Sequence, residues 1–300
     1  REMNNYTVVT ELVLLGLSDD PDFQIVTFLF LFITYVLSFT GNLTLTTLTS
    51  VNSHLQTPMY FFLHNVSFLE ISFTTVCIPR CLGAVITRDK TISYNNCAAQ
   101  LFFIFMRVTE FYILTAMSYD SFVAICKPLR YTRSTNRKLC SLLLSYSHPL
   151  CFFSPPPDYC ASKVIDHFAC DYFPLLELSC SNTWLLEVIG FYLALVTLLF
   201  TLALMILSYM CVIRTILRIR SSSKRKKTFS TCSSHMTVIS TSYGSCIFMY
   251  ANPCTKGVAI VNTSVAPVQN PFIYSLRNQE VKQVFKNFLQ NIVFSKLGGF

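Results

Sequence analysis

Charged residues are scarce in this sequence: Asp, Glu, Lys and Arg make up 13% of its 300 residues, whereas a soluble domain carries about 25%. Glycine is scarce too, with eight residues, and the chain has no glycine-rich phosphate loop and no paired nucleophile and base. These absences argue against a soluble protein and against an enzyme. A transporter or channel is a weaker alternative, because inverted repeats and rings of intramembrane charge are also missing.

Apolar residues are abundant, at 52% of the chain with a mean hydropathy of +0.49. They form blocks, and a helix needs about 20 apolar residues to cross a bilayer. The sequence predicts an all-α integral membrane bundle of seven helices, at about 24–49, 58–79, 98–125, 139–153, 184–213, 233–252 and 257–276. The first block is expected to act as an uncleaved signal anchor. The fourth should be short or distorted, because three prolines follow it at 155–157.

The basic residues indicate the orientation of these helices. Lysine and arginine near membrane helices stay on the cytoplasmic side, and 16 of the 23 fall in the segments 127–138, 214–227 and 277–296. We therefore expect one seven-helix domain over residues 1–300, with an extracellular tail at 1–23 and a cytoplasmic tail at 277–300 that contains a short helix. The net charge of +8 is better explained by this topology and by attraction to anionic membrane lipid than by binding to nucleic acid.

Two features of the outer side suit an oxidising, extracellular environment. Asn5 begins an Asn-Tyr-Thr glycosylation sequon in the outer tail. Four cysteines, Cys97, Cys160, Cys170 and Cys180, also lie on this side. Their spacing is too wide for a Cys-x-x-Cys zinc site, so we expect two disulfides among them.

Motifs spread along almost the whole chain resemble the odorant receptors of the tetrapod type, within the rhodopsin-like G-protein-coupled receptors. They are Gly41-Asn42, PMYFFL at 58–63, MSYDSFVAICKPLRY at 117–131, Ser208-Tyr209, KTFSTCSSH at 227–235 and NPFIYSLRN at 270–278. The resemblance implies a receptor for small volatile odorants that activates a stimulatory G-protein and raises cAMP. It implies location in the plasma membrane of olfactory cilia, no cofactor, and the disulfide pairs Cys97–Cys170 and Cys160–Cys180.

Two acidic residues lie within predicted membrane helices. Glu70 and Glu110 sit at a depth where a charge costs at least about 2.5–3.5 kcal/mol, so they are interpreted as a shared polar centre that holds a proton or a sodium ion and rearranges on activation. The alternative is two separate carboxyls, each neutralised by its own hydrogen bonds. The resemblance adds Asn42, Asn270, Pro271 and Tyr274 to this centre.

The resemblance also implies a ligand pocket in the outer half of the bundle and a coupling surface at the inner ends. The pocket positions are Phe105, Met106, Val108, Thr109, Ile189, Leu193, Tyr243, Ile247, Tyr250 and Thr263, each of which could instead be plain packing. The coupling positions are Asp120, Ser121, Phe122, Tyr209 and His235. Tyr243 is the strongest of the ligand positions, because it stands at the family's helix-six toggle beside Gly244.

Several departures from the family pattern bear on whether the receptor works. Ser121 stands where the Asp-Arg-Tyr motif has arginine, with Phe122 in place of tyrosine, so G-protein coupling is expected to be impaired. Arg107, inside the third helix, is interpreted as pairing with Glu110 or binding an acidic odorant, although drift in a decaying gene explains it as well. The spacing from Cys97 to Asp120 is one residue short. An alternative is therefore a degenerate receptor that never signals, retained in the endoplasmic reticulum because 139–153 cannot span.

Overall fold

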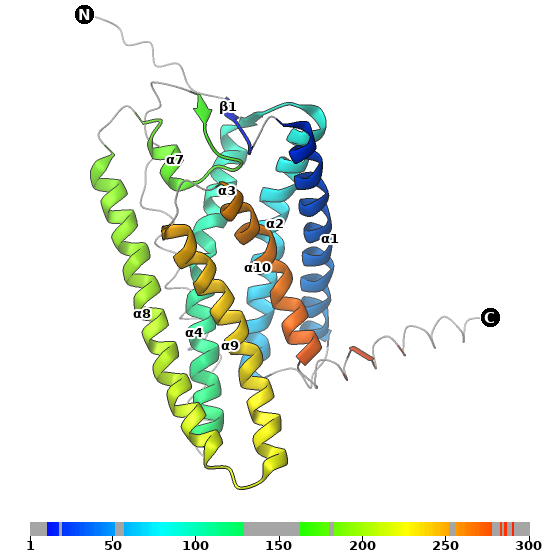
Figure 1. Cartoon of the computed structure of the whole chain (residues 1–300), viewed down its shortest axis with the longest axis vertical. Helices are drawn as coiled ribbons and strands as arrows, with labels where there is room; N and C mark the ends of the chain where they lie inside the picture. The colour runs from blue at the N-terminus through cyan, green and yellow to red at the C-terminus, as the bar shows by residue number, and fades with distance from the viewer. Residues whose placement is uncertain are drawn as a thin grey trace, which may run out of the picture.

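The computed structural model describes residues 11–17, 20–51, 57–128, 163–179, 183–251, 256–277, 283, 285, 286 and 290. Long helices run side by side as one bundle (Figure 1). They are α1 (Pro21–Val51), α2 (Pro58–Thr87), α3 (Tyr94–Met106), α4 (Val108–Cys126), α8 (Trp184–Leu217), α9 (Ser222–Ala251) and α10 (Lys256–Arg277). The fourth predicted helix, 139–153, and most of the predicted tail helix lie outside the described residues.

Four helical segments of the described chain are long and apolar enough to cross a membrane: α1, α2, α3 with α4, and α8. Apolar side chains also cover the outside of the bundle, as at Val26 on α1, which is 66% exposed, and Val196 on α8, which is 61% exposed. Large exposed apolar surfaces of this kind are unfavourable in water and suit the hydrocarbon of a bilayer. The helices therefore have the surface of a membrane protein.

Three helix boundaries differ from those expected. α2 continues through Pro79 to Thr87, since membrane helices tolerate proline where neighbouring groups satisfy the freed backbone. α9 begins at Ser222 rather than near 233, because its first turns are rich in lysine and arginine, which favour helix without being apolar. The third predicted helix is divided at Arg107 into α3 and α4.

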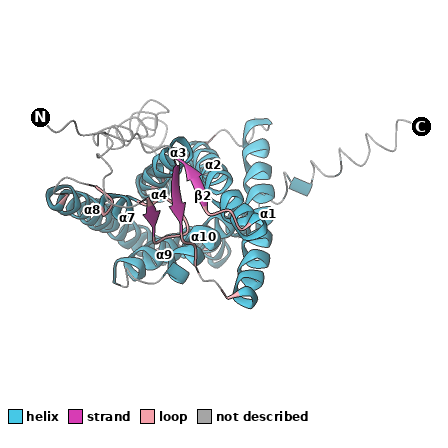
Figure 2. Ribbon diagram, turned by 90° about the horizontal axis from the view of Figure 1, so that it is seen from above, coloured by secondary structure: helices cyan, strands magenta, loops and turns pink. Residues whose placement is uncertain are grey.

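A small sheet covers the outer end of the bundle, which the all-α expectation did not include (Figure 2). β1 (Glu11–Leu14) pairs antiparallel with β2 (Thr91–Ser93) and parallel with β3 (Val164–Ile165). Its apolar side chains, among them Leu12 and Ile165, pack with the short helix α7 (Tyr172–Leu176) around a disulfide between Cys97 and Cys170. The expected extracellular tail is thus partly structured, and the bond to Cys97 pairs as the resemblance implied.

His167 gives this outer layer a predicted dependence on pH. Burial, the largest cause, holds the pKa of His167 below its usual range despite the opposing charge of Asp171, and the Ala169 backbone N–H donates to its Nδ1 at 3.3 Å. The folded state therefore takes up the proton less readily than the unfolded chain, whose histidine pKa is about 6.5. Stability should be lost as pH falls below about 6.5. Thermal unfolding midpoints at pH 7.5 and 5.5 should differ more for the wild type than for His167→Gln, and an equal difference in both would contradict this prediction.

α1 and α10 approach each other closely at Gly41. A Cβ atom added there would lie 2.9 Å from Cγ of Pro271. One position along, the Asn42 amide donates to the Pro267 carbonyl at 2.9 Å and to the Ser38 carbonyl at 3.0 Å. The glycine thus allows α1 to reach the backbone of α10, as small residues do between membrane helices.

Gly41→Ala is expected to lower stability by about 1–3 kcal/mol, because the added methyl group overpacks a buried contact with a rigid ring. The measurement is the thermal unfolding midpoint of the purified chain in lipid nanodiscs. Gly83→Ala, on α2, is the matched control: its nearest neighbour would be Arg80 Nη1 at 4.0 Å, so its midpoint should be unchanged or higher. An unchanged midpoint for Gly41→Ala would show that the helices can separate without loss.

Candidate functional site

Three buried polar side chains meet in the middle of the bundle. Glu70 comes from α2, Glu110 from α4 and Asn270 from α10, and each is at most 5% exposed. The Asn270 amide donates to Oε1 of Glu70 at 3.4 Å and to Oε1 of Glu110 at 3.2 Å. The two carboxyls that the sequence singled out therefore share one site. The Asn42 amide nitrogen bonds instead to Ser38 and to the α10 backbone at Pro267, one turn before Asn270.

Arg107 completes this polar centre, which we define as Glu70, Arg107, Glu110 and Asn270. Its Nη2 atom lies 3.7 Å from Oε2 of Glu110 and 3.9 Å from Oε1 of Glu70, and its guanidinium carbon lies 4.6 Å from the centre of the Phe73 ring. The pairing with Glu110 matches one of the two interpretations of Arg107 from the sequence. The pairing with Glu70 was not predicted, because it joins residues on different helices.

The predicted ligand positions do not all face one enclosed space. Phe105 packs edge-on against Tyr172, with ring centres 5.4 Å apart, Met106 and Thr109 are buried, and Val108 is half-buried. Ile189, Leu193 and Ile247, however, are between 45% and 50% exposed. Thr263 is half-buried, and the side chain of Tyr250 lies outside the described part.

Tyr243 is the ligand position with the most connections. It is buried on α9, its hydroxyl donates to Thr201 Oγ1 on α8 at 2.7 Å, and its ring meets Phe111 on α4 with centres 4.8 Å apart. A single side chain thus joins three helices. A displacement of Tyr243 must change contacts with both neighbouring helices, which is the property expected of a switch residue.

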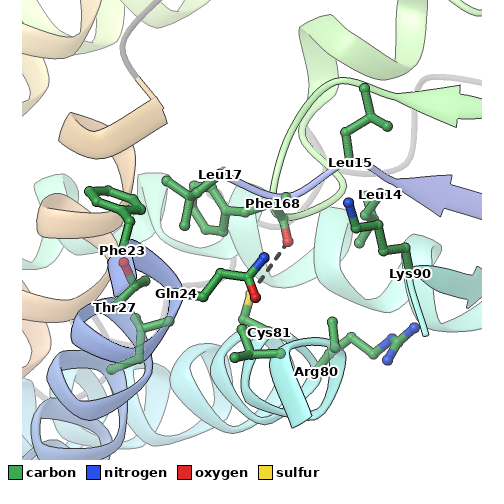
Figure 3. Close-up of a pocket in the computed structure, with 14 residues that line it drawn as sticks. Leu14, Leu15, Leu17, Phe23, Gln24, Thr27, Arg80, Cys81, Lys90 and Phe168 are labelled. Carbon is green, nitrogen blue, oxygen red and sulfur yellow. Dashed lines mark hydrogen bonds between the residues drawn. The ribbon is translucent and has the colours of Figure 1, made fainter. Parts of the chain in front are cut away.

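A pocket with a cavity volume of about 70 Å³ opens at the outer end, between β1, α1 and α2 (Figure 3). Leu17, Phe23, Gln24, Cys81 and Phe168 are among its lining residues. None of the predicted ligand positions lines it, and its volume is far below the roughly 300–1,000 Å³ of typical ligand pockets. We do not assign the odorant site to it.

At the inner ends, Tyr209 on α8 and His235 on α9 are buried and joined by a hydrogen bond between the tyrosine hydroxyl and Nδ1. Ser121 lies on α4 and its hydroxyl donates to the Met117 carbonyl of the same helix at 3.0 Å. Asp120 is buried, and Phe122 lies beneath the Lys127 ammonium at 5.4 Å. The Tyr274 side chain, which the resemblance adds to the polar centre, lies outside the described part.

A family model for olfactory receptors matches residues 31–291. The chain belongs to the olfactory receptor family. Human Olfactory receptor 6C3 is 75% identical to it, covering 97% of this chain and 98% of the relative, and human Olfactory receptor 6C1 is 61% identical, covering 97% and 99%. Squid rhodopsin has a similar fold, with a TM-score of 0.70 at 12% identity over 89% of this chain and 81% of that one.

Membership in the olfactory receptor family confirms the main predictions from the sequence. The chain is a multi-pass membrane protein of the rhodopsin-like receptor class, with odorants as ligands and a G-protein as signalling partner. It is a signalling receptor rather than an enzyme. The sequence did not predict two direct contacts between helices, Tyr209 with His235 and Tyr243 with Thr201. Tyr209, His235 and Tyr243 were each singled out, but a motif does not tell which side chains meet across helices.

Proposed function

We propose that this olfactory receptor binds a small, mostly apolar odorant in the outer half of its bundle, around Phe105, Met106, Val108 and Thr109, with Tyr243 as the residue that responds. The observation that carries the proposal is the position of Tyr243, which contacts Phe111 on α4 and Thr201 on α8. A ligand that moves this side chain changes the packing of three helices at once. The exposed Ile189, Leu193 and Ile247 complete the proposed site if α8 and α9 turn further inward. Tyr250 and Thr263 are its remaining proposed members.

The partner on the inner side is, in this proposal, a stimulatory G-protein whose activation raises cAMP. The coupling surface comprises Asp120, Ser121, Phe122, Tyr209 and His235. Exposed Arg225 and Lys226 at the start of α9 suit an acidic partner surface and the anionic lipid of the inner leaflet. Ser121 weakens this coupling, because a serine hydroxyl bonded to its own helix offers neither charge nor reach.

The polar centre is proposed to rearrange when the receptor is activated, with Pro271 as the hinge and Asn42 and Tyr274 as neighbours. Its carboxyls would exchange a proton or a sodium ion as the helices shift. Arg107 already supplies one positive charge to Glu70 and Glu110, with Nη2 within 3.9 Å of both. Less negative charge is therefore left for a sodium ion to neutralise here than in a centre of two carboxyls alone.

For location, we propose the plasma membrane of olfactory cilia, with Asn5 glycosylated and a second outer disulfide between Cys160 and Cys180. The competing proposal is retention in the endoplasmic reticulum, because the apolar block at 139–153 has only fifteen residues. Residues 5, 139–153, 160 and 180 lie outside the described part of the chain. The two proposals differ in where the N-terminus is found.

Surface staining and cAMP recording together test the proposed function. An N-terminal tag on the full chain should be stained on intact cells without detergent, at a level close to that of a signalling relative. The same cells should give a small cAMP rise to a mixture of volatile odorants. Staining only after permeabilisation would support retention, and full surface staining with no response to any odorant would contradict signalling by this chain.

A further inference from the structure

Arg107 is the most accessible charged group of the polar centre. Its side chain is 19% exposed, whereas the side chains of Glu70 and Glu110, taken without their backbone atoms, are 2% and 7% exposed. Because the guanidinium lies against Phe73 of α2 and beside Glu110 of α4, it faces the interior of the bundle. Of the three charged groups, the arginine offers the most accessible surface to a molecule between the helices.

The positive charge of Arg107 is already matched by its surroundings. Two carboxyls lie within 3.9 Å of its Nη2 atom. Arg107, Glu70 and Glu110 together have no net charge if one carboxyl is ionised, and a net charge of −1 if both carboxyls are ionised. A ligand carboxylate would lose its hydration here and gain no net attraction. An ammonium ligand would be repelled by the guanidinium, and both carboxyls already lie within 3.9 Å of it.

The guanidinium nevertheless keeps hydrogen-bond donors. It has five N–H bonds, and both ion pairs fall on Nη2, so the donors on Nε and Nη1 serve neither carboxyl. A neutral carbonyl oxygen can accept from them without bringing a charge into the bundle, and a hydrogen bond to a charged donor is stronger than one between neutral groups. An alkane would cover these donors and leave them unsatisfied.

We infer that Arg107 is a specificity-determining residue that selects neutral, oxygen-bearing odorants such as ketones, aldehydes and esters over acids, amines and hydrocarbons of the same length. This inference rests on the proposed odorant-binding function and names the ligand class of that site. It also decides between the two functional interpretations of Arg107 from the sequence, because the arginine that pairs with Glu110 is not a vacant anchor for an acidic odorant.

Four eight-carbon probes test the inference: 2-octanone, octanoate, octylamine and octane. Binding to the full chain in lipid nanodiscs at pH 7.4 is measured from the ligand-dependent rise of the thermal unfolding midpoint. The Kd of 2-octanone should be about tenfold lower than that of each other probe, the equivalent of one retained hydrogen bond to a charged donor. Arg107→Met should raise the Kd of 2-octanone to that of octane.

Two further variants keep the test decisive. Arg107→Met combined with Glu110→Gln removes one uncompensated carboxyl and should show the same loss of ketone preference if the single variant does not fold. Arg80→Met is the matched control: this arginine lies at the outer end of α2 and bonds to the backbone oxygens of Asp89 and Thr91, so the order of probes should be unchanged.

Other outcomes overturn the inference in distinguishable ways. Tightest binding of octanoate would make Arg107 an anion anchor, and tightest binding of octylamine would assign recognition to the carboxyls. If both Arg107 variants still prefer the ketone, a residue other than Arg107 supplies the hydrogen-bond donor. If none of the four probes shifts the midpoint of the wild type while the odorant mixture still raises cAMP in cells, the ligand class assigned to Arg107 is wrong and the odorant-binding function stands.

Discussion

Replacing Ser121 with arginine is expected to raise odorant-driven cAMP by about ten- to a hundredfold. A hydrogen bond to a charged donor contributes about 1.5–3 kcal/mol, so a single new bond to the G-protein accounts for a change of this size. In the wild type, the Ser121 hydroxyl is a single uncharged donor, and it bonds to the Met117 carbonyl one turn back. Arginine offers five donors in a fixed fork together with a permanent charge. The neighbouring Asp120, 4% exposed, would then lie next to a cation in the chain.

The measurement is a cAMP reporter in cells that express either chain, with the surface level recorded in parallel. Ser121→Gln is the matched control, since it adds length and polarity without charge and should give little gain. Equal, robust responses from the wild type and Ser121→Arg would show that the arginine is dispensable in this receptor. Silence of both chains at a normal surface level would place the defect outside this position.

The seven-helix fold could be predicted because a bilayer imposes a length and an apolar composition that are visible in the sequence. The shared site of Glu70, Glu110 and Asn270 could also be predicted, since a carboxyl buried in a membrane must find polar neighbours. The individual contacts within this site could not be predicted. Arg107 reaches Glu70 on another helix, and that contact depends on how the two helices are rotated about their axes.

The ligand positions show a further limit of the sequence. Side chains that face lipid and side chains that face the bundle interior are equally apolar, so hydropathy does not separate them. Tyr243 is buried, while Ile247, four residues later on the same helix, is 50% exposed. The outer sheet escaped prediction for a different reason: its strands have four, three and two residues, too few for an alternating pattern to be recognised.

The outer sheet depends on the disulfide between Cys97 and Cys170, and its removal is expected to be the most damaging change to stability. The bond closes a loop of 73 residues, which corresponds to about 4 kcal/mol in the chain-entropy model and to about 2–5 kcal/mol in typical measurements. Both cysteines are almost fully buried among Leu12, Leu14 and Ile92. Without the bond, the segment around β3 is tied to α3 only by weaker contacts, such as the Cys170 N–H to Gln100 Oε1 at 3.0 Å.

The double variant Cys97→Ala and Cys170→Ala should therefore unfold at a clearly lower temperature in nanodiscs and reach the cell surface at a reduced level. Dithiothreitol should lower the wild-type midpoint toward that of the variant and leave the variant unchanged. Cys211→Ala is the control, because Cys211 on α8 is exposed and carries no disulfide. If the double variant unfolds at the same temperature as the wild type, packing of the apolar residues around β1 is enough to hold the outer layer. In that case the disulfide would act on the assembly of the receptor rather than on its stability once folded.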